Sequence, residues 1–174
     1  MQPQASPAHA GANPHAAAAL EIPNRGWPGV GYTSGMGEVT ILVGRQGAGK
    51  THYCRTNLPD HVRVCQDEGP ARFESLLQHY RTLLERGVER IVIDRTNPRR
   101  QGRMQFARLA RERGYRVRIV YFDVPREVCE RRILQRPNHP TLQASQMHQA
   151  INRFESLLEM PTQDECDELV VCRS

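Results

Sequence analysis

The chain has 174 residues, enough for one domain with a sizeable core. Its net charge of +5 and pI near 9.2 indicate an anionic partner. The sequence lacks an apolar stretch of the roughly 18 residues that a membrane span needs, the apolar core of a signal peptide and any metal-ligand spacing among its five cysteines. We therefore expect a soluble cytoplasmic protein with free thiols, no membrane association and no evident protein partner.

The basic residues are unevenly distributed. Of the 24 Lys and Arg residues, 23 are arginines, and Lys50 is the one lysine. Residues 95–136 contain 13 arginines and four acids, whereas residues 155–174 contain six acids and one arginine. Two interpretations of the basic segment stay open, an anion-binding surface and a set of solvated helix faces.

Hydrophobic patterning divides the chain into a tail and a domain. Residues 1–37 are rich in Ala, Pro and Gly and have little periodic apolar surface, which predicts a disordered tail before a domain at 38–174. Strands are predicted at 39–43, 62–66, 90–94, 115–124 and 167–172. Helices are predicted at 50–56, 73–84, 99–113, 125–136 and 144–158. This alternation predicts an α/β fold in which helices cover both faces of a parallel sheet, with ligands at the carboxyl ends of the strands.

A glycine-rich motif, "GRQGAGKT", follows the first predicted strand and opens the first helix. It matches G-x-x-x-x-G-K-[ST], in which backbone N–H groups surround phosphate oxygens, the lysine reaches the β- and γ-phosphates and the hydroxyl ligates Mg²⁺. The predicted phosphate-binding residues are Gly44, Arg45, Gln46, Gly47, Ala48, Gly49, Lys50 and Thr51. The lone lysine occupies the position where the motif requires an ammonium, so a chance glycine turn is disfavoured.

Asp94 ends the apolar run "RIVID". A carboxylate at the end of a buried strand next to a phosphate loop can hold Mg²⁺ or its water shell. We therefore predict that Asp94 and Thr51 hold the metal, with an ordinary turn aspartate as the alternative.

Asp67 lies at the expected carboxyl end of the second strand, 17 residues after Lys50. A carboxylate in that position can accept the proton of an attacking hydroxyl. Asp67 is the predicted catalytic base, Glu68 is its competitor, and a helix-capping role for either acid remains open.

Two arginines share one face of the helix that begins near Pro125, because Arg132 and Arg136 are four residues apart. Together they could clamp a phosphoryl group whose charge spreads over its oxygens. The following "QRPNHP" would form a lid loop, and a solvated helix face is the alternative.

These elements, in this order, resemble the P-loop kinases of the polynucleotide kinase type. The resemblance covers about residues 39–172 and also includes "DRTN" at 94–97, "FDVP" at 122–125 and the ending "FESLLEMPTQDECDELVV". It implies a three-layer P-loop NTPase fold with a parallel sheet of four to five strands and an arginine-rich lid. It also implies ATP as donor with Mg²⁺, Asp67 as general base, Asp94 beside the metal and lid arginines at Arg132 or Arg136. One departure is Arg72, which comes two places later than the acceptor-binding arginine of the phage enzymes.

The motifs and the resemblance together predict a kinase that transfers the γ-phosphate of ATP to a hydroxyl on nucleic acid. The acceptor would be a 5′-hydroxyl end or a hydroxymethyluracil-type base, with DNA as the expected partner. One alternative is a P-loop kinase for a nucleoside, sugar or other small metabolite. Another is a nucleotide-gated switch or nucleic-acid binder that transfers no phosphate.

Overall fold

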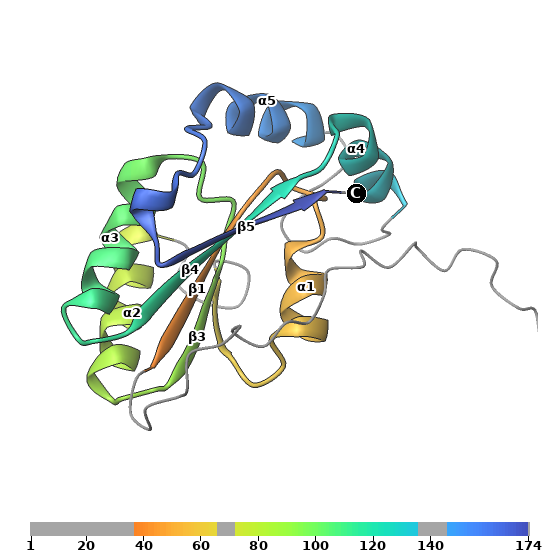
Figure 1. The fold of residues 1–174 in the computed structure, drawn as a ribbon. Coiled ribbons are helices and arrows are strands. Elements are labelled where there is room, and N and C mark those ends of the chain that lie inside the picture. Colours follow the sequence, from red (N-terminus) through yellow and green to blue (C-terminus); the bar gives the residue numbers. More distant parts are fainter. Residues whose placement is uncertain (1–36, 66–71, 136–145, 174) are drawn as a thin grey trace, which may run out of the picture.

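The computed structural model describes residues 37–65, 72–135 and 146–173. They contain a five-stranded parallel sheet with the strand order β2-β3-β1-β4-β5 (Figure 1). The strands are β1 (Glu38–Val43), β2 (Val62–Cys65), β3 (Arg90–Asp94), β4 (Arg116–Asp123) and β5 (Glu168–Arg173). The helices are α1 (Lys50–Asn57), α2 (Phe73–Glu85), α3 (Arg100–Arg111), α4 (Arg126–Leu134) and α5 (Met147–Leu157), with a short 3₁₀ helix, η2 (Gln163–Glu165).

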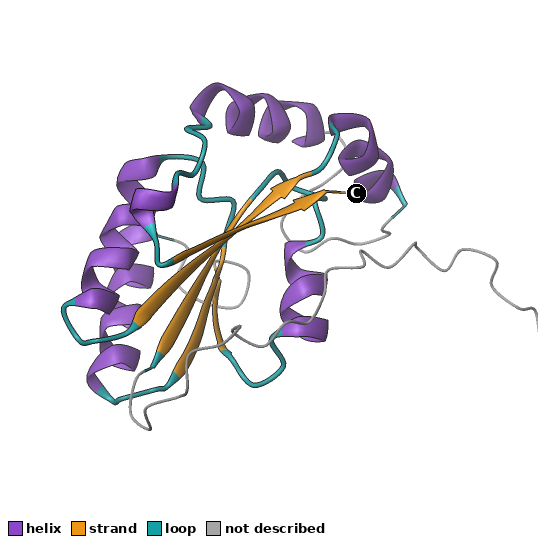
Figure 2. Ribbon diagram, viewed as in Figure 1, coloured by secondary structure: helices purple, strands orange, loops and turns teal. Residues whose placement is uncertain are grey.

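The sheet separates two apolar cores. Helices α2 and α3 cover one face and α1 covers the other, as Figure 2 shows. On the first side Tyr80 and Phe106 pack edge to face, with ring centroids 5.3 Å apart. On the second side Tyr53 packs against Phe122 in the same manner at 5.5 Å. The predicted three-layer α/β fold of the P-loop NTPase type is confirmed.

The element boundaries follow local sequence signals. Gly87 and Gly114 have φ values of 70° and 75°, a left-handed conformation that ends α2 and α3 at low cost for glycine. Pro125 is the N-cap of α4, where its missing N–H group removes no helical hydrogen bond. Every predicted element is present, and where the bounds can be compared they coincide or differ by one or two residues. The predicted tail, Pro137 and Ala144 lie outside the described residues.

The basic and acidic segments of the chain pair with each other. Four arginines of the segment 95–136 form ion pairs with acids of the segment 155–174. The pairs are Arg100–Asp164, Arg103–Glu165 at 2.7 Å, Arg118–Glu168 at 2.7 Å and Arg126–Glu155 at 3.0 Å. Much of the charge asymmetry is therefore neutralised within the fold, an interpretation that the sequence analysis did not include.

Two expectations from composition can be compared with the fold. All five cysteines are free and buried, which confirms the prediction of free thiols. No helix in the described part of the chain combines the length and apolarity needed to cross a bilayer.

Candidate phosphate and metal site

The glycine-rich loop joins the carboxyl end of β1 to the first residue of α1. Gly47 and Gly49 have φ values of 79° and 101°, in the left-handed region that side chains rarely adopt. A Cβ atom on Gly47 would lie 2.5 Å from the carbonyl oxygen of Cys129 in α4. The loop is thus shaped both by its own glycines and by the helix packed against it.

Lys50 is almost completely buried, with 9% of its surface exposed. Its Nζ donates hydrogen bonds to the carbonyl oxygens of Gly44 at 2.9 Å and Arg45 at 2.7 Å. These contacts hold the ammonium within the loop, where a compact point charge suits phosphate oxygens better than a planar guanidinium does. The contact of Lys50 with the β- and γ-phosphates stays a prediction.

Thr51 and Asp94 meet at the base of the loop. Thr51 Oγ1 donates a hydrogen bond to Asp94 Oδ2 at 2.9 Å, and only 4% of the Asp94 side chain is exposed. A hydroxyl and a carboxylate are the oxygen ligands that Mg²⁺ prefers, and Mg²⁺ commonly uses one or two protein ligands with water and substrate phosphates. The side chains present therefore fit a magnesium ion.

Arg63 is a member of this site that sequence analysis missed. Its Nε lies 2.8 Å from Asp94 Oδ2, across the β2–β3 pairing. The available signal was an arginine inside the predicted strand "VRVC", because a cation in a buried strand needs an anionic partner. The ion pair holds the Asp94 carboxylate in place at the base of the loop.

The loop after β3 is tied directly to the phosphate loop. The Gly44 N–H group donates to the Thr96 carbonyl at 3.1 Å, and Asn97 Nδ2 donates to the Leu42 carbonyl at 2.8 Å. Asn97 has a φ of 44°, a conformation that asparagine tolerates better than most residues. The "DRTN" segment thus positions the site through Asn97 as well as through Asp94.

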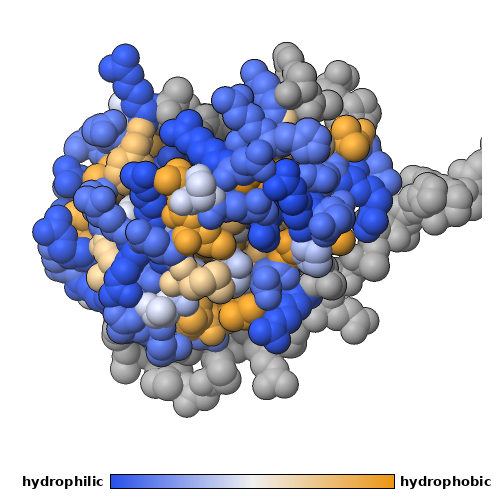
Figure 3. Space-filling model, turned by 90° about the horizontal axis from the view of Figure 1, so that it is seen from above, coloured by the Kyte–Doolittle hydropathy of each residue, from blue (hydrophilic) through white to orange (hydrophobic). Residues whose placement is uncertain are grey.

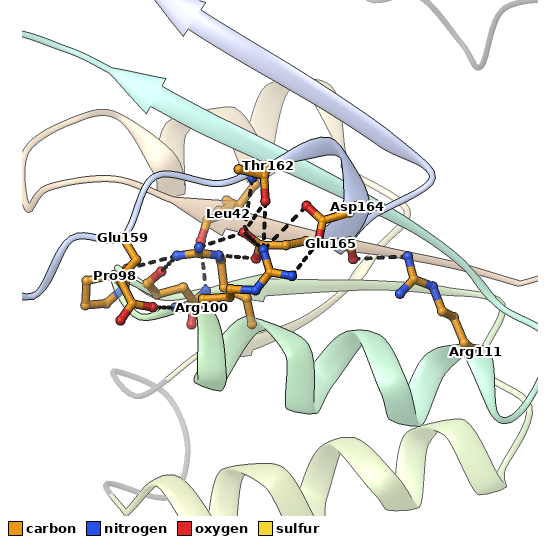
Figure 4. Close-up of polar contacts among 10 residues, drawn as sticks. Leu42, Pro98, Arg100, Arg111, Glu159, Thr162, Asp164 and Glu165 are labelled. Carbon is orange, nitrogen blue, oxygen red and sulfur yellow. Dashed lines mark hydrogen bonds and ion pairs between the residues drawn. The ribbon is translucent and has the colours of Figure 1, made fainter.

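A buried ion pair supports the loop that follows β3. Arg103 and Glu165 are both fully buried and make two hydrogen bonds, at 2.7 and 2.9 Å. Arg103 NH1 also donates to the carbonyls of Asn97 and Pro98, at 3.1 and 2.8 Å. Figure 4 shows how Glu165 and its neighbours before β5 converge on the loop that enters α3. The position of the site therefore depends on the C-terminal segment.

An open pocket of about 580 Å³ lies beside the phosphate loop. The loop contributes Gln46, the segment after β3 contributes Arg95 and Thr96, and α5 contributes Arg153 and Phe154, among other lining residues. Helix α5 crosses above the carboxyl ends of the strands (Figure 1), and hydrophilic side chains cover most of the face seen from that side (Figure 3). The pocket borders the loop and is large enough for a second substrate.

The remaining predicted site residues are Arg45, Arg132, Asp67 and Arg136. Arg132 NH1 lies 3.5 Å from the Ala48 carbonyl, so α4 brings this arginine to the phosphate loop. Arg45 points away from the loop's centre, since its Nε lies 2.9 Å from Glu155 and its NH1 donates to the Val124 carbonyl at 3.0 Å. Asp67 and Arg136 lie outside the described residues, so the base and the second lid arginine stay predictions. The chain leaves β2 at Cys65, which pairs in register with Asp94.

Comparison with known proteins defines the family. Residues 64–157 match the AAA domain family, and the chain therefore belongs to it. The matched segment begins after the phosphate loop and contains Asp94, Arg132 and all of α5. No curated protein matches the chain.

Solved structures of kinases share the fold. A sugar kinase from Janibacter sp., solved without ligand, is 16% identical with a TM-score of 0.57, and the match covers 79% of this chain and 85% of that one. The APS kinase of Mycobacterium tuberculosis, solved with AMPPNP and APS, is 16% identical with a TM-score of 0.50, covering 78% and 88%. At such identities the likeness concerns the fold, which is that of the P-loop kinases.

Proposed function

We propose that the chain is an ATP-dependent kinase that transfers the γ-phosphate to a hydroxyl group of a small molecule. The observation that carries the proposal is the contact of Thr51 with Asp94, 2.9 Å long, beside a loop that encloses the Lys50 ammonium. Together they supply a cation, a nest of amides and a metal-binding oxygen pair around one point, which phosphoryl transfer requires.

Each residue has a role in this proposal. The loop amides and Lys50 hold the β- and γ-phosphates, while Thr51 and Asp94 hold the metal. Bound Mg²⁺ would neutralise charge on the phosphate oxygens. Arg132, beside the Ala48 carbonyl, contributes a second cation where charge develops. Asp67 accepts the proton of the attacking hydroxyl.

Three observations favour a small acceptor over the nucleic acid that the sequence resemblance predicts. The pocket beside the loop, about 580 Å³, has the size of small-molecule sites. Four of the 13 arginines of the segment 95–136 are paired with acids of the segment 155–174, which reduces the positive charge available to a phosphate backbone. Two of the structural neighbours are a sugar kinase and an APS kinase.

A nucleic-acid acceptor is the second candidate. Arg72, Arg99 and Arg153 are exposed, and Arg72 and Arg99 precede α2 and α3 at the edge where the strands end. Such arginines could contact a phosphate backbone. A polynucleotide acceptor would make binding fall steeply with added salt as counterions are released, whereas a small acceptor would give a shallower response.

The test is a transfer assay with γ-labelled ATP and a panel of acceptors. The panel contains nucleosides, sugars, sugar phosphates, 5′-hydroxyl DNA, 5′-hydroxyl RNA and hydroxymethyl-base DNA. We expect label on a small molecule, loss of transfer in Lys50→Ala, and loss of transfer with retained ATP binding in Asp67→Asn. Asp60→Asn, at an exposed acid paired with Arg90, is the matched control and should retain activity.

The outcomes separate the candidates. Label on an oligonucleotide would favour the second candidate, and label recovered only as free phosphate would favour a nucleotide-gated switch. Full activity in Asp67→Asn would refute the assignment of the base and would leave the phosphate site in place.

A further inference from the structure

We infer that the pocket between the phosphate loop and α5 binds an anionic group of the acceptor, so that the substrate is a small alcohol carrying a phosphate or a carboxylate. This inference rests on the proposed function and specifies its acceptor. Arg95, Gln46 and the charge of the pocket wall support it.

Arg95 is a cation with no ion-pair partner among the residues that the structure describes. Its Nε atom is buried and has no hydrogen-bond partner within the described part of the chain. Its guanidinium carbon lies 5.0 Å from the ring centroid of Phe73, a cation–π contact that helps to position it. The Arg95 side chain is only partly exposed, so its charge is partly withdrawn from water at a cost in free energy. An anion in the pocket would offset that cost and accept hydrogen bonds from the fixed fork.

Gln46, which also lines the pocket, adds an acceptor without a donor among the described residues. Its Oε1 is buried and accepts no hydrogen bond from the residues that the structure describes. A buried amide oxygen without a donor is costly, and a hydroxyl group of a ligand would satisfy it. Because Gln46 belongs to the phosphate loop, a hydroxyl bound there lies next to the phosphates that the loop holds. A ligand that satisfies both groups would place an anion at Arg95 and a hydroxyl at Gln46.

The charge of the wall supports the same ligand. Arg95 and Arg153 line the pocket, and no aspartate or glutamate occurs among its described lining residues. The neighbouring acid on α5, Glu155, is paired with Arg45 at 2.9 Å and with Arg126 at 3.0 Å. An anionic ligand therefore meets two cations and no competing carboxylate from these walls.

The pocket lies beside the nucleotide phosphate site and is distinct from it. Lys50 and Thr51 are absent from its described lining, and Gln46 is the loop residue that borders both spaces. A ligand of up to sugar-phosphate size fits within about 580 Å³. Its anionic end would bind at Arg95, and its hydroxyl would point toward the loop.

The experiment uses inorganic phosphate as a probe, measured by calorimetry on protein saturated with AMPPNP and Mg²⁺. Phosphate is also titrated into the Lys50→Ala variant. This second titration tests the pocket even if the protein does not bind the nucleotide. We expect Arg95→Gln to weaken phosphate binding by about 10-fold or more, the usual worth of a charge-assisted pair. Arg95→Lys should retain part of the affinity. Arg108→Gln removes the same charge from an exposed position on α3 and should leave binding unchanged.

Matched acceptors in the transfer assay give the second readout. Ribose 5-phosphate is compared with ribose, and glycerol 3-phosphate with glycerol. We expect the charged member of each pair to be preferred, and the preference to disappear in Arg95→Gln. Phosphate binding unaffected by Arg95→Gln, absence of phosphate binding, or preferential transfer to neutral acceptors or oligonucleotides would overturn the inference. Failure of AMPPNP to bind would instead refute the proposed kinase.

Discussion

Thr51 and Asp94 are 43 positions apart in the chain, yet Thr51 Oγ1 donates a hydrogen bond to Asp94 Oδ2 at 2.9 Å. The contact exists because β1 and β3 are parallel neighbours in the sheet, so the loop after one strand meets the last residue of the other. A P-loop hydroxyl and a strand-end carboxylate thereby come within reach of one metal ion.

The first prediction concerns this pair. Asp94→Asn removes the charge but preserves the shape, and we expect transfer to fall by on the order of 100-fold, comparable to the loss of one transition-state contact. The affinity of the Asp94→Asn variant for nucleotide should be nearly the same in Mg²⁺ as in EDTA. The measurement is a nucleotide titration with and without the metal, together with the transfer assay. Asp123→Asn is the control, since Asp123 also ends a strand but is exposed and paired with Arg173. Equal Mg²⁺ dependence in both variants would contradict the metal assignment.

The second prediction concerns the packing of α4 on the phosphate loop. Gly47→Ala would place Cβ 2.5 Å from the Cys129 carbonyl and 3.0 Å from Ile133 Cγ1, at a φ of 79°. We expect loss of nucleotide binding and a free energy of unfolding lower by about 1–3 kcal/mol. Gly102→Ala is the control, because its Cβ would meet nothing within 4 Å and alanine favours the helix by about 1 kcal/mol. Nucleotide titration and urea unfolding distinguish the two variants.

The third prediction concerns the buried ion pair beneath the loop after β3. Both Arg103 and Glu165 are 0% exposed, and Arg103→Met leaves the carboxylate with Arg100, 3.8 Å away, in place of its 2.7 Å partner. Removing one partner of a buried pair typically costs about 3–5 kcal/mol. Urea unfolding should show that loss, whereas Glu112→Gln, at a pair that is 67% and 52% exposed, should change stability by less than about 0.5 kcal/mol. Similar stability of the two variants would show that the pair is dispensable.

The fourth prediction concerns the thiols. Burial raises the pKa of Cys54 to about 12 and that of Cys172 to about 11, from a reference value of 9.0. At pH 8 both stay protonated in the folded chain, so iodoacetamide should label them slowly until urea unfolds the protein. Because the pKa values are raised on folding, this contribution to stability is present below pH 9 and declines as the pH rises toward 11 to 12. Rapid labelling of the folded chain would contradict the burial.

Local sequence signals determined the elements and the chemistry of the loop. Apolar runs with turn residues between them predict all five strands, since a strand buried on both faces needs a continuous apolar run whatever its neighbours are. The motif from Gly44 to Thr51 predicts the phosphate loop because its geometry depends on glycines and a helix start within eight consecutive residues.

Contacts between distant residues were decided by the tertiary structure. The strand order β2-β3-β1-β4-β5, which no local pattern encodes, decides the partners of Arg63 and Arg103 and the packing of α4 on Gly47. It also decides that Arg95 Nε is buried without a hydrogen-bond partner among the described residues. The basic and acidic segments could equally have faced solvent, and they pair because the crossovers bring the chain after α5 against α3 and β4. Sequence by itself thus determined which groups can act on a phosphate, whereas the topology decided which of them are neutralised and which are left for a ligand.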